Sequence, residues 1–309
     1  MTRVVVTAHA KLNLGLAIGP ARADGFHDLA SIFQSISLAD TLSAERTTRG
    51  FSLRMRREDV AVRGTPASAA AEAIPAGAGN LVLRAARLAA ERLGLRGGAR
   101  FVLTKRIPAQ AGMGGGSADA AAALMAMATL HGVRLSRQQR IELALELGSD
   151  VPFAITGGTA YGRGRGEMLE IRRLTAPFRA LVAMPHWRIS TAQAFRRFDD
   201  VNYGLTGRPH ETRFTSILRG ERLNPLHASR LGNSFEAVLG PQKESFESLC
   251  ARLRAAGLLE PRLTGSGSGV FGIVPAAASL AAITGRFVGD EPLYAVRSVG
   301  RGLRLDLQS

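Results

Sequence analysis

The stretch that most constrains this chain is KRIPAQAGMGGGSADAAAAL, residues 105–124, in which a glycine cluster joins a strand end to a run of strong helix formers. Gly112, Gly114, Gly115 and Gly116 allow positive φ angles and let a ligand approach the backbone with no Cβ in the way. Ser117 is suited to cap the following helix, whose first N–H groups lack intrahelical partners. Those N–H groups and the positive end of the helix dipole predict a site for an anion, most naturally a phosphate.

The loop matches neither of the two commonest phosphate motifs. A P-loop requires G-x-x-x-x-G-K-[ST], but Gly116 is followed directly by Ser117, with no lysine. The fingerprint G-x-G-x-x-G also fails, since its last position, counted from Gly112, falls on Ser117. The alternative is a flexible connection before an alanine-rich helix. Four glycines in five positions disfavour it, because glycine loses more conformational freedom on folding than any other residue.

Length and composition indicate a folded protein with an ample core. The chain has 309 residues, 46% hydrophobic and 21% charged, which suits one large or two ordinary domains. No apolar run reaches the roughly 18 residues of a membrane span, and the N-terminus is too short in apolar length for a signal peptide. The single cysteine, Cys250, excludes an internal disulfide and a cysteine-based zinc site. We expect a cytoplasmic protein with no membrane partner, a monomer or weak homodimer.

The net charge of +15 raises the hypothesis of a nucleic-acid partner. Of 40 basic residues, three are lysines, Lys11, Lys105 and Lys243, and the arginines are scattered along the chain. We therefore expect no nucleic-acid partner, and a basic RNA-binding protein stays a distant alternative. If arginine replaces lysine wherever the two are interchangeable, the remaining lysines mark positions that need a compact point charge.

The order of predicted elements favours an α+β chain of two domains. Strands are expected near 4–6, 12–18, 29–38, 51–55 and 101–104, and helices near 81–93, 117–131 and 137–147. From about residue 160 the pattern restarts, with strands near 168–171, 180–184, 269–274 and 294–299 and helices near 191–198, 233–239, 242–256 and 276–287. Residues 57–79 are rich in Ala, Gly and Pro and indicate a variable loop, after which Asn80 is placed to cap a helix.

Three further segments carry candidate chemistry. Lys11 lies in an alternating strand on the same face as Asn13, so it either faces solvent or points with Asn13 into a cleft. Asp150, in GSDVPF, either caps the next turn or acts on an attacking hydroxyl, since phosphoryl transfer asks the protein mainly for positioning and charge stabilisation. The segment TGSGSG at 264–269 is either a hairpin turn or a second ligand-binding loop.

These segments together resemble the GHMP kinase superfamily, whose three motifs they match in order and spacing over nearly the whole chain. The motifs correspond to the segment around Lys11, to residues 108–123 and to residues 263–272. AKLNLGL at 10–16, RADGFH at 22–27, GSDVPF at 148–153 and GRGRGE at 162–167 are most similar to the kinases of a cytidine diphosphate-linked methylerythritol. The resemblance implies a two-domain GHMP kinase fold, with a ribosomal protein S5 domain 2-like domain over 1–162 and a ferredoxin-like domain over 163–309.

The resemblance also implies ATP-dependent phosphorylation of the 2-hydroxyl of that small molecule in non-mevalonate isoprenoid precursor biosynthesis, with ATP and Mg²⁺ as cofactors. Lys11 and Asp150 would be catalytic, Asp150 taking the hydroxyl proton and Lys11 stabilising the developing oxyanion. Phe26 and His27 would hold the cytosine, the first by stacking and the second by imidazole hydrogen bonds to the base edge. The residues implied in ATP binding are Pro108, Ala109, Gln110, Ala111, Gly112, Met113, Gly114, Gly115, Gly116, Ser117, Ala118, Lys105 and Asn80, with Ser117 near phosphate or metal. Substrate contacts are also implied for Asn13, Gly265, Ser266 and Gly267, the last three closing over the phosphate region.

Some positions depart from the family pattern. Phe26 replaces the common tyrosine and keeps the stacking face. Gln110 stands where the loop usually has glycine, so it must accept a conformation that glycine normally takes. Trp187 is expected either as a second aromatic wall for the cytosine or as a core or rim residue. The near alternative is another small-alcohol kinase, such as homoserine or mevalonate kinase, which the Phe26–His27 pair disfavours because those substrates carry no base.

Overall fold

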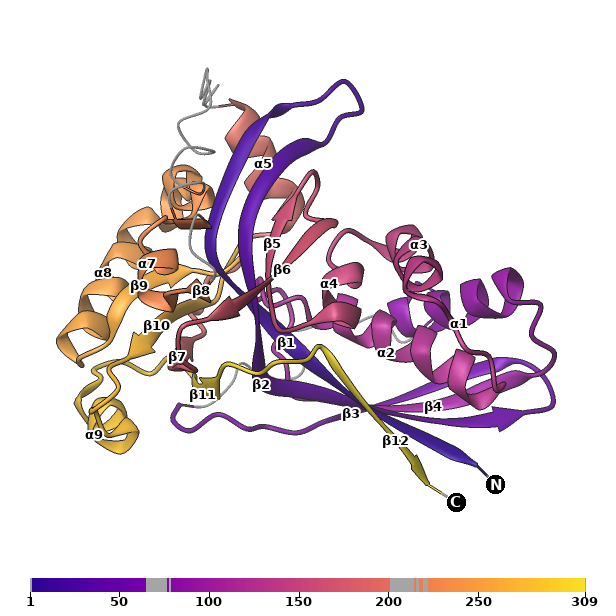
Figure 1. Ribbon diagram of the computed structural model, residues 1–309. Helices are drawn as coiled ribbons and strands as arrows, with labels where there is room; N and C mark the ends of the chain where they lie inside the picture. Colours follow the sequence, from indigo (N-terminus) through magenta and orange to yellow (C-terminus); the bar gives the residue numbers. More distant parts are fainter. Residues whose placement is uncertain are drawn as a thin grey trace.

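The computed structural model describes residues 2–64, 77, 79–200, 214, 217–218 and 222–308 (Figure 1). Within these ranges the strands form an eight-stranded and a four-stranded sheet. Most of the variable loop expected at 57–79 lies outside the described residues. The strands are β1 (Arg3–Ala21), β2 (His27–Thr47), β3 (Phe51–Arg57), β4 (Gly98–Lys105), β5 (Thr159–Arg163), β6 (Met168–Leu174), β7 (Arg179–Ala183), β8 (Arg222–Leu223), β9 (Leu259–Leu263), β10 (Val270–Val274), β11 (Leu293–Arg297) and β12 (Leu303–Gln308).

The helices lie singly or in groups between these strands along the chain. The α-helices are α1 (Leu81–Arg92), α2 (Gly115–Leu130), α3 (Arg137–Leu147), α4 (Val151–Thr156), α5 (Thr191–Asp200), α7 (Pro225–Ser229), α8 (Lys243–Ala255) and α9 (Leu280–Arg286), and the 3₁₀ helices are η2 (Ser234–Val238) and η3 (Gly240–Gln242). No helix in the described ranges is both long and apolar enough to cross a bilayer.

The two longest strands, β1 and β2, form the spine of the larger sheet. They pair antiparallel along most of their length through a turn at Asp24 and Gly25, where Gly25 has a φ of +79°. The strands expected separately at 4–6 and 12–18 are one continuous strand with a register shift between His9 and Lys11. β2 is long enough to pair on its other side with both β5 and β4, and β12 pairs with β1, so the two chain ends lie on neighbouring strands (Figure 1).

Helix α2 lies at the centre of the helical layer, packed against β1, β2 and α1. Its alanine-rich sequence has no polar face, which suits a helix covered on all sides. Its N-cap is Gly114 in the left-handed conformation, and no side chain caps it. The capping role predicted for Ser117 is therefore wrong, because Ser117 lies inside the first turn. Asn80 does cap α1, accepting the N–H of Val82 at 2.9 Å.

The smaller sheet has the strand order β11-β7-β10-β9 and carries α8 and α9. A second hydrophobic core lies between them, around Leu181, Leu253 and Val270. The helix expected at 233–239 is the 3₁₀ helix η2, and α9 begins at Leu280, later than predicted. The short strands β5, β8, β9 and β12 were not predicted. β6 and β12 lie in the larger sheet, and the division at residue 162 stays a prediction.

Candidate active site

The glycine loop leads into α2 and leaves three backbone N–H groups without helical partners. The first intrahelical bond runs from the N–H of Ala118 to the carbonyl of Gly114 at 2.9 Å, so the N–H groups of Gly115, Gly116 and Ser117 stay unpaired within the helix. All three residues line a cavity. Together with the positive end of the helix dipole, they meet the requirements for binding a phosphate.

The second glycine segment, residues 264–269, packs directly against this loop. It joins the antiparallel strands β9 and β10 and lines the same cavity through residues 265–267. The N–H of Ser268 donates to the carbonyl of Gln110 at 3.0 Å. The segment is therefore both a strand connection and a wall of the site.

Gln110 keeps the backbone conformation that glycine normally takes. Its φ is +52°, in the left-handed region, which costs a side-chain-bearing residue about 1–2 kcal/mol. The hydrogen bond from Ser268 to its carbonyl holds it there. Gln110 therefore accepts the backbone conformation that the sequence predicted for this position.

Gly112 is expected to tolerate no side chain. A Cβ there would lie 1.9 Å from the carbonyl oxygen of Thr264, so Gly112→Ala must push the two glycine segments apart. An overpacking cost of about 1–3 kcal/mol corresponds to a loss of about 5- to 150-fold in ATP affinity. Gly132→Ala is the matched control, because Gly132 has a similar φ of +67° with nothing within 4 Å of the added Cβ. Calorimetric ATP binding should change only in Gly112→Ala, and equal affinities in the two variants would contradict this packing role.

Lys11 and Asp150 meet at the cavity. Lys11 Nζ lies 3.6 Å from Asp150 Oδ2, with side-chain exposures of 9% and 36%, and donates a hydrogen bond to Asn13 Oδ1. Of the two alternatives for Lys11 and Asn13, the cleft is confirmed. Asp150 stands at the N-cap position of α4, yet its side chain makes no capping hydrogen bond. The carboxylate therefore faces Lys11 and the cavity.

Asn13 is fixed on both sides, which in turn orients Lys11. Its backbone N–H donates to Thr264 Oγ1 at 3.1 Å, and its side-chain amide donates to Ser31 Oγ at 2.7 Å. Since the amide nitrogen is engaged by Ser31, its oxygen is the atom left for Lys11.

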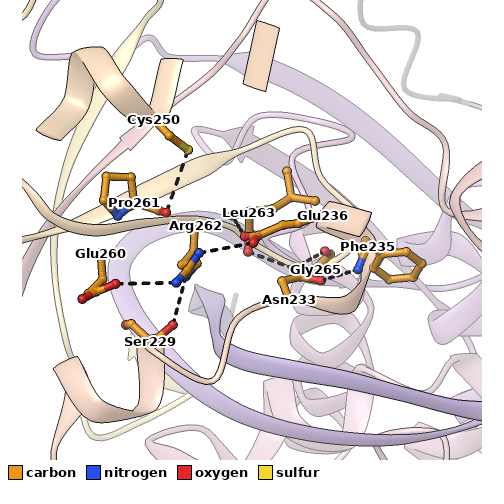
Figure 2. Close-up of polar contacts among 10 residues, drawn as sticks. All are labelled: Ser229, Asn233, Phe235, Glu236, Cys250, Glu260, Pro261, Arg262, Leu263 and Gly265. Carbon is orange, nitrogen blue, oxygen red and sulfur yellow. Dashed lines mark hydrogen bonds and ion pairs between the residues drawn. The ribbon is translucent and has the colours of Figure 1, made fainter. Parts of the chain in front are cut away.

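A buried polar network anchors the second glycine segment (Figure 2). The Asn233 amide donates to the carbonyls of Leu263 at 2.9 Å and Gly265 at 2.8 Å. Glu236 accepts the N–H of Leu263 at 2.9 Å and lies 3.4 Å from Arg262. Burial raises the pKa of Glu236, while the Leu263 N–H and Arg262 oppose that rise. The sequence offered no signal for Asn233 or Glu236, because their partners lie far along the chain.

A second part of the cavity is aromatic. Phe26 is 48% exposed in the β1–β2 turn, and the Arg165 guanidinium carbon lies 4.5 Å from its ring centroid. The rings of His27 and Phe195 stack with centroids 5.3 Å apart and 25° between their planes. Asp199 Oδ1 lies 3.0 Å from His27 Nε2. This part therefore offers aromatic faces together with a cation and a carboxylate.

The glycine loop, residues 265–267, the Lys11–Asp150 pair and the aromatic part line one cavity of about 870 Å³, a size typical of small-molecule sites. It brings together most of the predicted site residues: Lys11, Asn13, Phe26, His27, Pro108, Gln110, Ala111, Gly112, Met113, Gly114, Gly115, Gly116, Ser117, Asp150, Gly265, Ser266 and Gly267. The predicted residues outside its lining are Asn80, Lys105, Ala109, Ala118 and Trp187.

Comparison with known proteins identifies the family. Residues 80–158 match the family model described as the GHMP kinases N terminal domain. The 4-diphosphocytidyl-2-C-methyl-D-erythritol kinase of Pelotomaculum thermopropionicum is 35% identical over 96% of this chain and 98% of its own. That of Moorella thermoacetica is 37% identical over 88% of this chain and 90% of its own. The chain belongs to the GHMP kinase family.

Solved structures place this GHMP kinase chain in the same fold. A crystal structure of 4-(cytidine 5'-diphospho)-2C-methyl-D-erythritol kinase matches with a TM-score of 0.72 and 32% identity, covering 97% of this chain and 100% of that one. Homoserine kinase from Cytophaga hutchinsonii matches with a TM-score of 0.70 at 16% identity, over 98% of this chain and 97% of its own. The second likeness shows the fold alone. The predicted family and α+β GHMP kinase fold are confirmed.

Lys105 supports the glycine loop of this GHMP kinase from outside the cavity. Its ammonium donates to Asp40 and, at 2.7 Å, to Asp119 of α2, and all three side chains are buried. Asp40 also accepts the N–H groups of Arg106 at 2.6 Å and Ile107 at 2.9 Å. This triad, defined as Lys105, Asp40 and Asp119, ties β4, β2 and the start of α2 together. The structure thus gives Lys105 a position that supports the loop, and its predicted place towards the nucleotide stays a prediction.

The triad contains two carboxyl groups for one ammonium, so one carboxyl tends to keep its proton. Burial raises the pKa of Asp119 well above its usual range, and Lys105 opposes this rise while Asp40 adds to it. Burial alone would lower the pKa of Lys105, but the two carboxylates outweigh it and raise that pKa. Asp119 therefore binds a proton more readily than an exposed aspartate does.

Asp119→Asn is expected to become more stable relative to wild type as the pH rises. A carboxyl whose folded-state pKa is raised contributes stability that is full below its unfolded pKa and is lost as pH rises through the folded pKa. Asparagine resembles the protonated carboxyl group and does not titrate, so the variant does not lose this stability as the pH rises. Urea unfolding of both proteins from pH 5 to 9 measures the difference in unfolding free energy, and a difference independent of pH would contradict the raised pKa of Asp119.

Sequence reasoning gave no role to three residues of the aromatic part, namely Arg165, Phe195 and Asp199. Trp187 packs against the second core and does not line the cavity, whereas Phe195 does. Arg165 belongs to the segment GRGRGE, which supported the family resemblance but did not predict a function for this arginine. Phe195 and Asp199 lie more than 160 residues from the hairpin that they face, and no spacing in the sequence links them to it.

The oxygen donors on the cavity suit a magnesium ion that arrives with ATP. The described residues contain no group of three or more His, Cys, Asp or Glu side chains able to hold a metal. Mg²⁺ usually keeps several waters and takes one or two carboxylates plus substrate phosphates. Ser117 and Asp150 both line the cavity and offer such a sparse set.

Proposed function

We propose that this GHMP kinase transfers the γ-phosphoryl group of ATP to the 2-hydroxyl of 4-diphosphocytidyl-2-C-methyl-D-erythritol, a step of non-mevalonate isoprenoid precursor biosynthesis. The observation that carries the proposal is a single cavity that joins an anion site, the Lys11–Asp150 pair and an aromatic part. The relatives that carry this substrate in their names support it at 35% and 37% identity over most of the chain.

Asp150 and Lys11 act on the hydroxyl. The Asp150 carboxylate accepts the hydroxyl proton as the oxygen attacks the γ-phosphorus, and ADP leaves with the electron pair of the broken P–O bond. Lys11, 3.6 Å from Asp150, is already fixed by Asn13 and stabilises the negative charge that develops on the oxygen. Preorganised charge of this kind costs no rearrangement at the moment of reaction.

The N-terminal turn of α2 holds the phosphates of ATP. The N–H groups of Gly115, Gly116 and Ser117 supply donors without a Walker lysine, and residues 265–267 cover the loop from the opposite segment. Mg²⁺, bound through the phosphates with Ser117 and Asp150 as the available protein oxygens, would neutralise charge on the transferring group.

The aromatic part receives the cytidine diphosphate end. Phe26 and Phe195 line the cavity and offer faces on which a base can stack. Arg165, which lies against Phe26, places a cation where a diphosphate would be attracted. Such a part is unnecessary for homoserine or mevalonate, which carry neither a base nor a diphosphate.

Initial rates of ADP release with the cytidylated alcohol, mevalonate and homoserine test the proposal. We expect kcat/KM for the cytidylated alcohol to exceed the other two by at least about 10³-fold, since a site with buried polar groups strongly rejects substrates that cannot pair with them. Preferred turnover of mevalonate or homoserine would replace this proposal by the corresponding kinase activity.

A further inference from the structure

Strand β12 forms an open edge of the larger sheet. It stands at one end of the strand order and pairs with β1 alone among the described strands (Figure 1). A strand at a sheet edge presents a row of backbone N–H and C=O groups on which the strand of another chain can pair. The side chains of β12 decide whether such pairing is favoured or blocked.

The backbone groups that point away from β1 belong to Leu303, Leu305 and Leu307. Their direction follows from the antiparallel ladder, in which hydrogen-bonded and non-hydrogen-bonded pairs alternate. The N–H of His9 donates to the carbonyl of Gly302 at 2.9 Å, so the adjoining pair of Ala8 and Leu303 is a non-hydrogen-bonded one. The same holds for every second residue after Leu303.

The leucine side chains of this edge lie on the buried face of the sheet, yet they are uncovered. Leu305 stands opposite Val6, and Leu307 stands opposite Val4, and residues that stand opposite each other share a face. Both valines are fully buried, whereas Leu305 is 37% and Leu307 67% exposed. The apolar face of the sheet therefore continues to this edge, where a further strand with apolar residues on the same face would extend it.

Two opposite charges stand on the other face of β12, one on each side of Leu305. Arg304 and Asp306 are 58% and 46% exposed, and Arg304 Nε lies 3.1 Å from Asp306 Oδ2. Charges of a single sign would block pairing between copies in every register, because like charges directly opposite are destabilising. Charges of both signs permit pairing in the register that sets each against its opposite.

We infer that β12 pairs antiparallel with β12 of a second copy of this chain, about a two-fold axis at Leu305. The axis sets Leu305 opposite its own copy and Leu303 opposite Leu307 of the second copy, so that the outward N–H and C=O groups meet in hydrogen-bonded pairs. Arg304 then faces Asp306 of the second copy. The leucines of the two copies form one apolar stripe across the junction.

The charges select this register over its neighbours. A shift of one copy by two residues keeps the outward backbone groups matched, but it sets either Arg304 against Arg304 or Asp306 against Asp306, which is destabilising. A shift by one residue sets leucines against charged residues and mismatches the two faces. The pairing centred on Leu305 is therefore the one that matches backbone, apolar and charged groups together.

Sedimentation velocity of the full chain between about 1 and 300 μM tests the inference, since small interfaces associate weakly. The wild type is expected to pass from monomer to dimer in this range. Arg304→Asp sets two aspartates against each other and Asp306→Arg two arginines, so each variant should weaken dimerisation by at least about 10-fold. An equimolar mixture of the two variants should dimerise as the wild type does, because opposite charges face each other again.

Arg100→Asp is the matched control. Arg100 is 61% exposed and lies 2.8 Å from Glu45, but its strand β4 has strands on both sides, so dimerisation should stay at the wild-type level. Circular dichroism verifies the fold of every variant. A wild type that stays monomeric at every concentration would overturn the inference and leave the edge to a different chain. A dimer that ignores both charge reversals, or a mixture that does not recover, would also overturn it.

A cysteine at the two-fold axis tests the register. The single native cysteine, Cys250, is buried, so Leu305→Cys supplies the reactive thiol. The Cα atoms of a hydrogen-bonded pair lie about 5.5 Å apart, within the range of a disulfide, and mild oxidation should link the two copies. Leu307→Cys is the control, since its own copy lies about 13 Å away along the strand. Equal cross-linking of the two variants would contradict the register.

The association is separate from the reaction proposed above. No residue of β12 lines the cavity, so the charge-reversal variants should bind ATP with wild-type affinity. A variant that loses both dimerisation and ATP binding would report a damaged fold, and the inference would then depend on the mixture of variants and on Leu305→Cys.

Discussion

Asp150→Asn is expected to lower kcat by about 10³-fold, within the range that a positioned general base contributes, with KM for both substrates nearly unchanged. Asparagine keeps the shape of the side chain but cannot take the hydroxyl proton. Because Asp150 makes no capping hydrogen bond and is 36% exposed, the substitution should leave the fold intact. Steady-state rates of ADP release, with circular dichroism to verify folding, measure the effect.

Substitution of Lys11, the ion-pair partner of Asp150, provides the control for Asp150→Asn. Lys11→Met should cost a comparable factor, and the double variant little more than the worse single one, since residues that act as a unit are strongly non-additive. Wild-type rates in a folded Asp150→Asn protein would contradict the base assignment. Multiplicative losses in the double variant would show instead that Lys11 and Asp150 act independently.

Lys105→Met is expected to lower the free energy of unfolding by about 3–5 kcal/mol, the usual cost of removing one partner from a buried ion pair. The substitution leaves Asp40, which is fully buried, beside Asp119, which is 7% exposed, without a counter-ion. Two adjacent buried carboxyl groups cannot both ionise, so one must take up a proton on folding. Urea unfolding at pH 7 measures the loss, and weakened ATP binding should accompany it because the triad anchors the start of α2.

Lys243→Met provides the comparison for this prediction. Lys243 is an exposed residue at the start of α8, and surface substitutions usually change stability by less than about 0.5 kcal/mol. A loss of less than 1 kcal/mol in Lys105→Met would contradict the supporting role of the triad.

The residue types of the glycine loop predicted the phosphate site correctly but misplaced the first residue of helix α2. The glycine cluster and the helix formers after it located the N-terminal turn of α2 within two residues. Ser117 was predicted as the N-cap because serine favours that position. In the structure Gly114, in the left-handed conformation, is the N-cap, so the helix begins earlier. A glycine can end the loop without a side-chain hydrogen bond, and residue preferences alone do not reveal this.

The scarcity of lysine was an informative signal. The three surviving lysines included Lys11 and Lys105, which are both buried and form ion pairs with carboxylates. Lys243, in contrast, is exposed. The scarcity of lysine could not reveal the partners of Lys11 and Lys105. Asp40 comes from β2 and Asp119 from α2, so the triad exists only after the sheet and helix have packed.

The aromatic part was the least predictable. Phe26 and His27 were singled out by the resemblance of RADGFH at 22–27 to the family motif, whereas the pair Asp24-Gly25 by itself predicted only the turn. Phe195 and Asp199 come from a helix that meets this turn only through tertiary packing, and their sequence carries nothing beyond an amphipathic helix.

The most direct test of the central claim is ³¹P NMR of the product formed from ATP and the cytidylated alcohol. Transfer across the Lys11–Asp150 pair to the 2-hydroxyl predicts one new phosphomonoester resonance, an intact diphosphate and one ADP per product. No new phosphomonoester with this alcohol, while mevalonate or homoserine becomes phosphorylated under the same conditions, would contradict the claim.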